Sequence, residues 1–197
     1  MAEVAKNPAR LDDHMLSILA SRHCSGLDVF ASKEPVDREE ISDAAIFTLL
    51  NRLVESYDMV LVDVPAHLQR KSGEILAHSD FVLVTGLFSV PSVREILGLC
   101  RRLRDLEVPD KRIGVAITDT EKNIFGMVSQ RFDSKSALGG RLTFFIRRDR
   151  DFAMECVDEG KSMMQTQPSR GICQDIAKLA EHLKTVTPLV GLRVETE

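Results

Sequence analysis

Tryptophan is absent from this sequence of 197 residues, and tyrosine occurs once, at Tyr57. The chain therefore offers few aromatic rings on which bases or sugars could stack. Its formal net charge of -4 is also opposite in sign to the basic surface that binds nucleic acids. Direct binding to DNA or RNA is therefore not expected.

Long apolar runs are missing as well. No stretch approaches the roughly 20 residues that span a bilayer, and the first residues, Met1–Lys6, lack the apolar core of a signal peptide. None of the four cysteines stands at C-x-x-C spacing, which argues against a zinc or redox motif. Cysteines scattered through apolar stretches are typical of a reducing compartment. We therefore expect a soluble, cytoplasmic protein.

A phosphate-binding loop is the third absence. Such a loop reads Gly-x-x-x-x-Gly-Lys-Ser/Thr and stands between a strand and a helix. The chain has one Gly-Lys-Ser, Gly160–Ser162, but Glu155 stands where the first glycine belongs, and the tripeptide follows a helical pattern instead of opening one. No other glycine precedes a lysine. The sequence thus contains no Walker A motif, and it has neither G-x-S-x-G nor H-E-x-x-H.

What the chain does contain is an alternation of short β-branched runs with amphipathic helical patterns. This alternation predicts βαβ units and therefore an α/β fold with a mostly parallel sheet flanked by helices. We expect one domain over residues 1–184 and a loose tail over 185–197. The expected strands are 27–31, 59–64, 81–85, 113–117 and 142–146, and the expected helices are about 11–22, 37–54, 92–103, 151–159 and 169–184.

Two details of this pattern are specific. The runs 59–64 and 81–85 are almost continuously apolar, which is typical of interior strands covered on both faces. Ser92 and Glu95 have the spacing of a capping box, so we expect them to begin the helix that follows the second run.

The strongest single feature is the segment Tyr57–Pro65, in which apolar residues lead to Asp63. A carboxylate at the end of a buried strand needs a partner, because an unpaired buried charge is costly. One interpretation is a Mg²⁺ ion, bound directly or through water, which is the role of a Walker B aspartate. The other is that Asp63 caps backbone amides at a strand-to-loop turn. Spacing alone leaves both interpretations open.

This segment resembles the "YDxVVVDLP" motif of CpaE/TadZ pilus-assembly proteins, members of the MinD/ParA superfamily. Further segments are similar to that family in the right order, and together the similarity covers roughly Asn7 to Leu183. They are residues 7–12 ("NPxRLD"), 26–31 ("GLxVLA"), 79–85 ("ADxVLLVT"), 146–161 ("IPxDxxxxxxAxxxGxP") and 167–169 with the final helix.

The resemblance implies a P-loop NTPase fold of the MinD-like (SIMIBI) type that lacks its first strand and Walker A loop. ATP and Mg²⁺ are the implied cofactors of the family, although we expect that this chain alone binds neither. At the nucleotide site, Asp63 would be the Mg²⁺-linked carboxylate and Pro65 would shape the switch loop. Thr118 stands where relatives have an asparagine that reads adenine, and a hydroxyl cannot make the paired contact of an amide.

The departures from the family weigh against catalysis. Arg147 replaces the proline of "IPxD", no catalytic residue carries over, and ATP hydrolysis by this chain alone is not expected. In relatives, the P-loop strand lies between the strands that end at Asp63 and Thr85, so its loss would close a gap or leave open edges that invite pairing. We expect a truncated form or a shortened reading frame, which the coding DNA upstream of Met1 would test.

The resemblance implies a localisation factor for pilus assembly or secretion. Such relatives often dimerise around ATP and position their machinery at the cell pole or at the inner-membrane face. The implied partners are proteins of that apparatus and a second copy of the chain, with membrane association only through partners. Two alternatives stay open: a fragment of an active ParA/MinD-type ATPase that positions DNA or the division site, and a nucleotide-independent α/β interaction domain.

Overall fold

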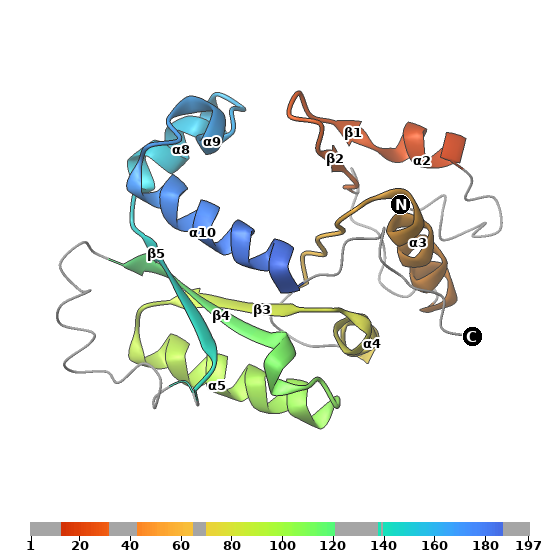
Figure 1. The fold of residues 1–197 in the computed structure, drawn as a ribbon, viewed down its shortest axis with the longest axis horizontal. Helices are drawn as coiled ribbons and strands as arrows, with labels where there is room; N and C mark the ends of the chain where they lie inside the picture. Colours follow the sequence, from red (N-terminus) through yellow and green to blue (C-terminus); the bar gives the residue numbers. More distant parts are fainter. Residues whose placement is uncertain (1–12, 32–42, 65–69, 121–137, 139, 187–197) are drawn as a thin grey trace. The chain divides into compact units, whose positions relative to one another are not determined.

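The structure is a computed structural model that describes residues 13–31, 43–64, 70–120, 138 and 140–186 (Figure 1). The chain forms two compact units, which are described separately. In the first unit the described residues are 13–31 and 43–63, and in the second they are 64, 70–120, 138 and 140–186.

The described residues of the first unit form two helices and a small hairpin. Helix α2 spans Asp13–Leu19 and α3 spans Asp43–Ser56, while β1, Ser21–Arg22, pairs antiparallel with β2, Asp28–Val29. Gly26 in the hairpin turn has a φ of 88°, a conformation that glycine adopts without steric cost. The core consists of Leu16, Leu49 and Leu53, with Leu19, Phe30, Tyr57 and Val60 packed against it.

Tyr57 joins the end of α3 to this hairpin. Its hydroxyl donates a hydrogen bond of 2.8 Å to the Asp28 carboxylate, and its ring meets Phe30 edge-on with centroids 5.9 Å apart. Tyr57 therefore has a structural role in the first unit.

Two strands predicted for this part of the chain are wrong. Residues 59–64 form no strand, and Leu61 and Val62 are 76% and 44% exposed. A strand needs a hydrogen-bonded neighbour, and no strand among the described residues pairs with this segment. The predicted strand 27–31 shortens to Asp28–Val29, and its partner is the antiparallel β1 instead of the main sheet.

The second unit contains a parallel sheet of three strands in the order β3-β4-β5. They span Val82–Leu87, Ile113–Thr120 and Leu142–Arg147. In the register of the sheet, Val84 lies beside Val115 and Ala116 beside Phe144. The predicted α/β fold with a parallel sheet is confirmed, and β4 extends beyond the predicted residue 117 to Thr120.

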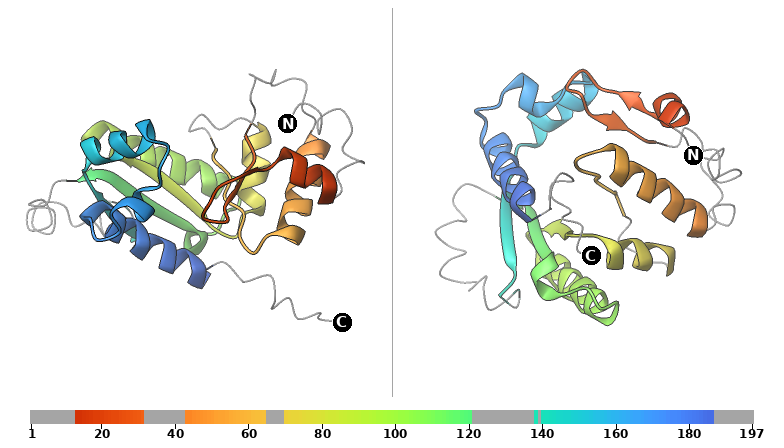
Figure 2. Two further views of the ribbon diagram at one scale, coloured as in Figure 1. Left: turned by 90° about the horizontal axis from the view of Figure 1, so that it is seen from above. Right: turned by 45° about the vertical axis from the view of Figure 1, so that its right-hand side comes forward.

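Helices cover both faces of this sheet, as Figures 1 and 2 show: α5, Val90–Asp105, lies on one face and α10, Gly171–Val186, on the other. This double cover explains why the strands are almost continuously apolar. The α5 face carries the larger core, and each fully buried aliphatic side chain there contributes about 1.5–3 kcal/mol. Its most buried members are Ile96, Cys100, Leu103, Ile113, Val115 and Ile117.

The α10 face is packed by aromatic rings. His182 of α10 lies 5.4 Å from the Phe144 ring and 6.3 Å from the Phe81 ring, measured between centroids. Gly114 of β4 makes room for this packing, because a Cβ there would lie 2.6 Å from the Cζ atom of Phe81.

The remaining elements connect these layers. They are α4, Arg70–His78, the 3-10 turn η2, Asp110–Arg112, α8, Arg150–Asp158, and α9, Met163–Thr166. Helix α10 continues to Val186, and residues 187–197, which include most of the predicted tail, lie outside the described part. None of the described helices is both long and apolar enough to cross a membrane.

Candidate functional site

The carboxyl edge of the β3-β4-β5 sheet is the place where an open parallel sheet binds its ligands. Three segments of the chain leave the sheet there, after Leu87, Thr120 and Arg147. The segment after Thr120 lies outside the described residues. The site is therefore described from the β3-α5 turn, the end of β4 and the segment from β5 into α8.

The turn from β3 into α5 is held by two serines. Ser89 is the N-cap of α5, and its hydroxyl oxygen accepts a hydrogen bond of 3.3 Å from the Ser92 backbone N–H. The Ser92 hydroxyl oxygen in turn accepts a bond of 2.9 Å from the Leu87 backbone N–H. The predicted capping box of Ser92 and Glu95 is therefore wrong, because the helix begins one turn earlier and Ser92 supports the preceding strand end.

The threonines at the end of β4 are tied to the neighbouring strands. Thr118 donates from its hydroxyl to the Gly86 carbonyl at 3.2 Å, and Thr120 donates to the Ile146 carbonyl at 2.9 Å. The Arg148 backbone N–H donates to the Thr120 carbonyl at 2.8 Å, which continues this pairing past the end of β5. These hydroxyl protons are therefore used within the sheet, and each oxygen keeps only acceptor capacity toward a ligand.

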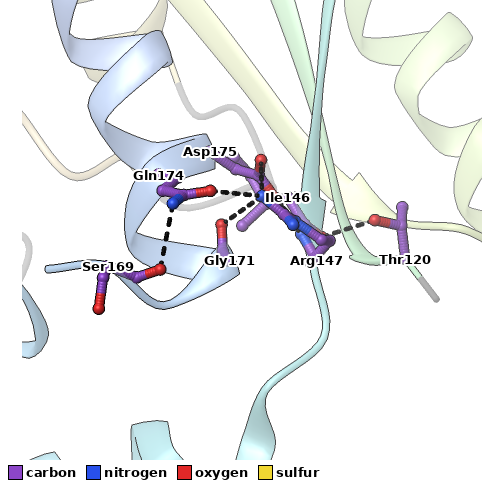
Figure 3. A network of polar contacts seen from close by, with 7 residues as sticks. All are labelled: Thr120, Ile146, Arg147, Ser169, Gly171, Gln174 and Asp175. Atoms are coloured by element: carbon purple, nitrogen blue, oxygen red, sulfur yellow. Dashed lines mark hydrogen bonds and ion pairs between the residues drawn. The ribbon is translucent and has the colours of Figure 1, made fainter. Parts of the chain in front are cut away.

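Arg147, at the end of β5, is bound by the first turns of α10 (Figure 3). Its Nε donates to Asp175 Oδ2 at 2.7 Å and its Nη2 to Oδ1 at 2.8 Å, so the ion pair has two contact points. The Arg147 backbone N–H donates to the same Oδ2 at 3.1 Å, and Nη2 also donates to the Gly171 carbonyl at 2.9 Å. Such two-point pairs fix geometry as well as charge.

Burial and charge act against each other at Asp175, whose side chain is 8% exposed. Desolvation raises its pKa, but the hydrogen bonds and positive charge of Arg147 outweigh burial and hold the pKa below its usual value. The same hydrogen bond raises the pKa of Arg147. Both groups are therefore charged over the physiological pH range.

A second cation supports the segment that enters α8. Arg170 pairs with the carboxylate of Asp149, the N-cap residue of α8, at 2.9 Å. The Arg170 guanidinium also lies 4.4 Å from the centroid of the Phe152 ring, a cation-π contact. Together with the pair of Arg147 and Asp175, this contact attaches the β5-α8 connection to α10 and the turn before it.

Sequence reasoning missed Asp175, although it noted Arg147 as a departure from the family motif. A signal for it was present. Asp175 lies on the apolar stripe of α10, three residues after Ile172 and four before Leu179. A carboxylate on a buried stripe needs a cationic partner, and Arg147 was the unexplained cation.

The Gly160–Ser162 tripeptide ends α8, as predicted. It also opens a helix, which was not predicted, because Ser162 is the N-cap of the four-residue α9. The Gly160 backbone N–H donates to the Val157 carbonyl at 3.1 Å and that of Lys161 donates to the Cys156 carbonyl at 2.8 Å, so both amides cap the end of α8. Gly160 has a φ of 63°, as is usual for a helix-ending glycine. The Lys161 ammonium pairs with Glu159 at 2.8 Å. A phosphate cradle needs free amides and a free lysine, so this tripeptide does not fit a phosphate.

The other predicted site residues have different outcomes. Asp63 is exposed, so the expectation of a carboxylate at the end of a buried strand is wrong. Pro65 lies outside the described residues. Thr118 stands at the carboxyl edge as expected, and its role toward a base stays a prediction. Among the described residues, no group of three His, Cys, Asp or Glu side chains could hold a metal ion.

No model of a known protein family matches this chain, and no curated protein has a significantly similar sequence. Solved structures are similar in fold. A ParA family ATPase from Chlorobium tepidum TLS superposes with a TM-score of 0.78 at 22% identity, over 92% of this chain and 75% of that one. The MinD cell division protein of Aquifex aeolicus superposes with a TM-score of 0.68 at 15% identity, over 94% of this chain and 80% of that one.

The same Aquifex protein in its MinC:MinD complex superposes with a TM-score of 0.58 at 15% identity, over 90% of this chain and 77% of that one. At these identities the likeness shows the fold alone. The chain therefore has the P-loop NTPase fold of the ParA and MinD proteins, with its parallel sheet and flanking helices.

Proposed function

We propose that this chain is a localisation factor for pilus assembly or secretion, of the CpaE/TadZ kind, and that as it stands it does not hydrolyse ATP. One observation carries the non-catalytic part of this proposal, and the motif resemblance supports the localisation part. In a chain with the ParA and MinD fold, the one Gly-Lys-Ser tripeptide closes α8, with its amides and its lysine engaged in local contacts. Catalysis by this fold depends on a phosphate cradle, whereas binding a protein partner does not.

The carboxyl edge of the sheet supports the same proposal. By the sequence resemblance, Thr118 replaces an asparagine that reads adenine in relatives, and its hydroxyl donates a hydrogen bond to the Gly86 carbonyl. Arg147 takes the place of a proline and is bound to Asp175. Because Thr118 and Arg147 are bound to other residues of the chain, these groups are less available to a nucleotide. Such an edge is suited to a binding surface of fixed shape.

For a nucleotide-bound state we propose limited roles for the predicted residues. Asp63 would hold Mg²⁺ through water, Pro65 would shape the segment after it, and Thr118 would lie near the base. ATP and Mg²⁺ are proposed as cofactors of relatives with this fold, and we expect this chain alone to bind neither.

Protein partners are the proposed route of action. The similar MinD protein has been solved in a complex with MinC, which supports protein binding by this fold. We propose that proteins of a pilus or secretion apparatus are the partners here, that the chain can pair with a second copy, and that it acts in the cytoplasm at the cell pole or the inner-membrane face through those partners.

Calorimetric titration with MgATP tests the nucleotide part of the proposal. We expect no binding at sub-millimolar nucleotide. Micromolar affinity that is lost in Asp63→Ala would instead assign the chain to active ATPases. Glu55→Ala, an exposed carboxylate on α3, is the matched control and should leave the titration unchanged.

A cell experiment tests the localisation part. A fluorescent fusion of the chain, expressed in its native host, is expected to form foci that are lost when the pilus or secretion genes of that host are deleted. Foci that follow the nucleoid or the division site in cells lacking those genes would contradict the proposal and favour a ParA/MinD-type positioning role. A diffuse signal with normal piliation after gene deletion would contradict both.

A further inference from the structure

The solvent-facing side of α8 carries apolar side chains with no cover among the described residues. Met154 is 52% exposed and Val157 is 75% exposed. They stand three residues apart and therefore share one side of the helix. The opposite side buries Phe152 and Cys156, which pack with Cys173 of α10. The exposure of Met154 and Val157 thus follows from the orientation of a well-anchored helix.

Three carboxylates stand along this apolar pair: Asp151, Glu155 and Asp158, all exposed. Within the described part of the chain, none of the three has an ion pair or a side-chain hydrogen bond. The other carboxylates around α8 are paired, since Asp149 binds Arg170 and Glu159 binds Lys161. Arg150, the first residue of α8, is also exposed and lies one helical turn before Met154. The face therefore carries three carboxylates and one cation beside its exposed hydrophobic side chains, a net negative charge.

This distribution of charge is unfavourable for the helix itself. Asp151 and Glu155 are like charges at i, i+4, and Glu155 and Asp158 at i, i+3, which destabilises a helix by about 0.2–0.5 kcal/mol per pair. Glu155 and Asp158 also stand in the last turn, where the helix dipole favours cations and where α8 has no basic residue. Asp151, in the first turn, is favourably placed for the dipole, so the unfavourable charges are those of the last turn. Natural proteins depart from such local rules at functional sites.

We propose that the α8 face, defined by Asp151, Met154, Glu155, Val157 and Asp158, binds a cationic amphipathic helix of a protein partner. Apolar side chains of that helix would cover Met154 and Val157, and its lysines or arginines would pair with the three carboxylates. Amphipathic helices recognise protein surfaces in this way, through apolar anchors at helical spacing.

Charge excludes the other occupants. A second copy using the same face would bring like carboxylates together across the interface, because a two-fold contact pairs a surface with itself. Nucleic acids and anionic membranes are repelled because the three carboxylates outnumber the one cation, Arg150. The face is also held in place before binding, by the contact of Arg170 with Phe152 beneath it, so little ordering is needed when the partner binds.

The inference rests on the proposed function, because it states the chemical character of the expected protein partner, namely a helix with an apolar side and a basic side. Its test is independent of the cell experiment, since it uses the purified chain and a synthetic probe. A failed peptide titration with intact polar foci would overturn only the α8 face. Peptide binding together with diffuse fluorescence would overturn only the proposed function.

The probe is a fluorescent peptide of about 18 residues, five helical turns, with leucines on one side and lysines on the other. We expect saturable binding by fluorescence anisotropy in the micromolar range, weakened by added salt because exposed charges are screened. A peptide with glutamates in place of the lysines, and one with serines in place of the leucines, should each bind at least about tenfold more weakly, a loss of about 1.4 kcal/mol.

Variants of the chain locate the site. Met154→Ser with Val157→Ser should weaken binding at least about tenfold, and so should the neutral triple variant Asp151→Asn, Glu155→Gln, Asp158→Asn. These positions are exposed, and circular dichroism confirms that each variant is folded. Equal affinity of all variants, or no binding at millimolar peptide, would overturn the proposal.

The matched control is a neutral triple variant elsewhere: Glu95→Gln, Asp105→Asn and Glu107→Gln, on and just after α5. It removes the same charge from exposed positions and should bind the lysine peptide as tightly as the natural chain. An equal loss in this control would mean that net charge attracts the peptide and would overturn the site. Self-association of the chain that disappears in Val157→Ser would assign the face to a second copy instead.

Discussion

The guanidinium of Arg147 and the carboxylate of Asp175 form a two-point ion pair, with contacts of 2.7 and 2.8 Å, that joins the end of β5 to α10. The Arg147 backbone N–H adds a third hydrogen bond to the same carboxylate. The side chains are 23% and 8% exposed. The pair is therefore mostly removed from water, and its loss has consequences that a surface pair would not have.

Removing one partner of this pair should destabilise the chain. We expect Asp175→Ala to lower the free energy of unfolding by about 3 kcal/mol, because it leaves the Arg147 charge buried without compensation. Arg147→Ala should cost a similar amount, and the double variant should cost clearly less than the sum. Urea unfolding measures all three. Glu181→Ala, which breaks an exposed pair with Lys184 on the same helix, is the control and should cost about 0.5 kcal/mol or less. Additive effects in the double variant would contradict the coupling.

Acid should remove the contribution of Asp175. Its pKa in the folded chain lies below the ordinary value of 3.8, because Arg147 outweighs the opposing effect of burial. A carboxyl group with a lowered pKa adds stability above its unfolded-state pKa, and this stability is lost as the pH falls through the folded-state pKa. The difference in unfolding free energy between the natural chain and Asp175→Asn should therefore be largest near neutral pH and should decrease below pH 3.8. Urea titrations across this range would contradict the assignment if the difference stayed constant.

Gly86 in β3 and Gly98 in α5 should respond in opposite directions to substitution by alanine. At Gly86 a Cβ would lie 2.7 Å from both Ile96 Cδ1 and Ser92 Oγ, so Gly86→Ala should destabilise the chain by about 1–3 kcal/mol. At Gly98, inside α5, a Cβ meets nothing within 4 Å, and Gly98→Ala should stabilise by about 0.5–1 kcal/mol through helix propensity. Thermal unfolding compares the two, and the same sign for both would contradict the packing described for the turn.

Substitutions at the start of α5 test whether Ser89 or Ser92 caps the helix. Ser89→Ala should cost about 1 kcal/mol, because the Ser92 backbone N–H loses its side-chain acceptor. Glu95→Gln, which would matter only if Ser92 were the cap of a capping box, should change stability by less than about 0.5 kcal/mol. The reverse order of these effects in denaturant titrations would restore Ser92 as the first residue of the helix.

Several elements were predictable because their local patterns agree with their tertiary surroundings. Strands β3, β4 and β5 are short, β-branched runs between turn residues, and helices on both faces explain their continuous apolar character. The Gly160–Ser162 tripeptide was recognisable as unsuited to phosphate because it followed a helix. Its amides bind the carbonyls at the end of α8.

Other features depended on partners distant in the chain. The run 59–64 has the composition of a strand, but no described strand pairs with it. Leu61, Val62 and Asp63 are exposed, whereas Val60 packs against the core of the first unit. Ser89 and Ser92 are both residue types that cap helices well, and only the helix geometry decides that Ser89 is used. In the sequence, Asp175 is a carboxylate on an apolar stripe with no evident partner. The fold brings Arg147, which is distant in sequence, beside it.

By itself, the sequence determined the fold class, because the periods of hydrophobic residues record which faces of each element are buried. It also determined that Gly160–Ser162 is no phosphate loop. Only the tertiary structure decided which apolar run joins the sheet, which carboxylate Arg147 binds, and that Met154 and Val157 face solvent beside unpaired carboxylates. The physical reason is that strand pairing and charge pairing join residues that are distant in sequence, whereas helix formation and capping are local.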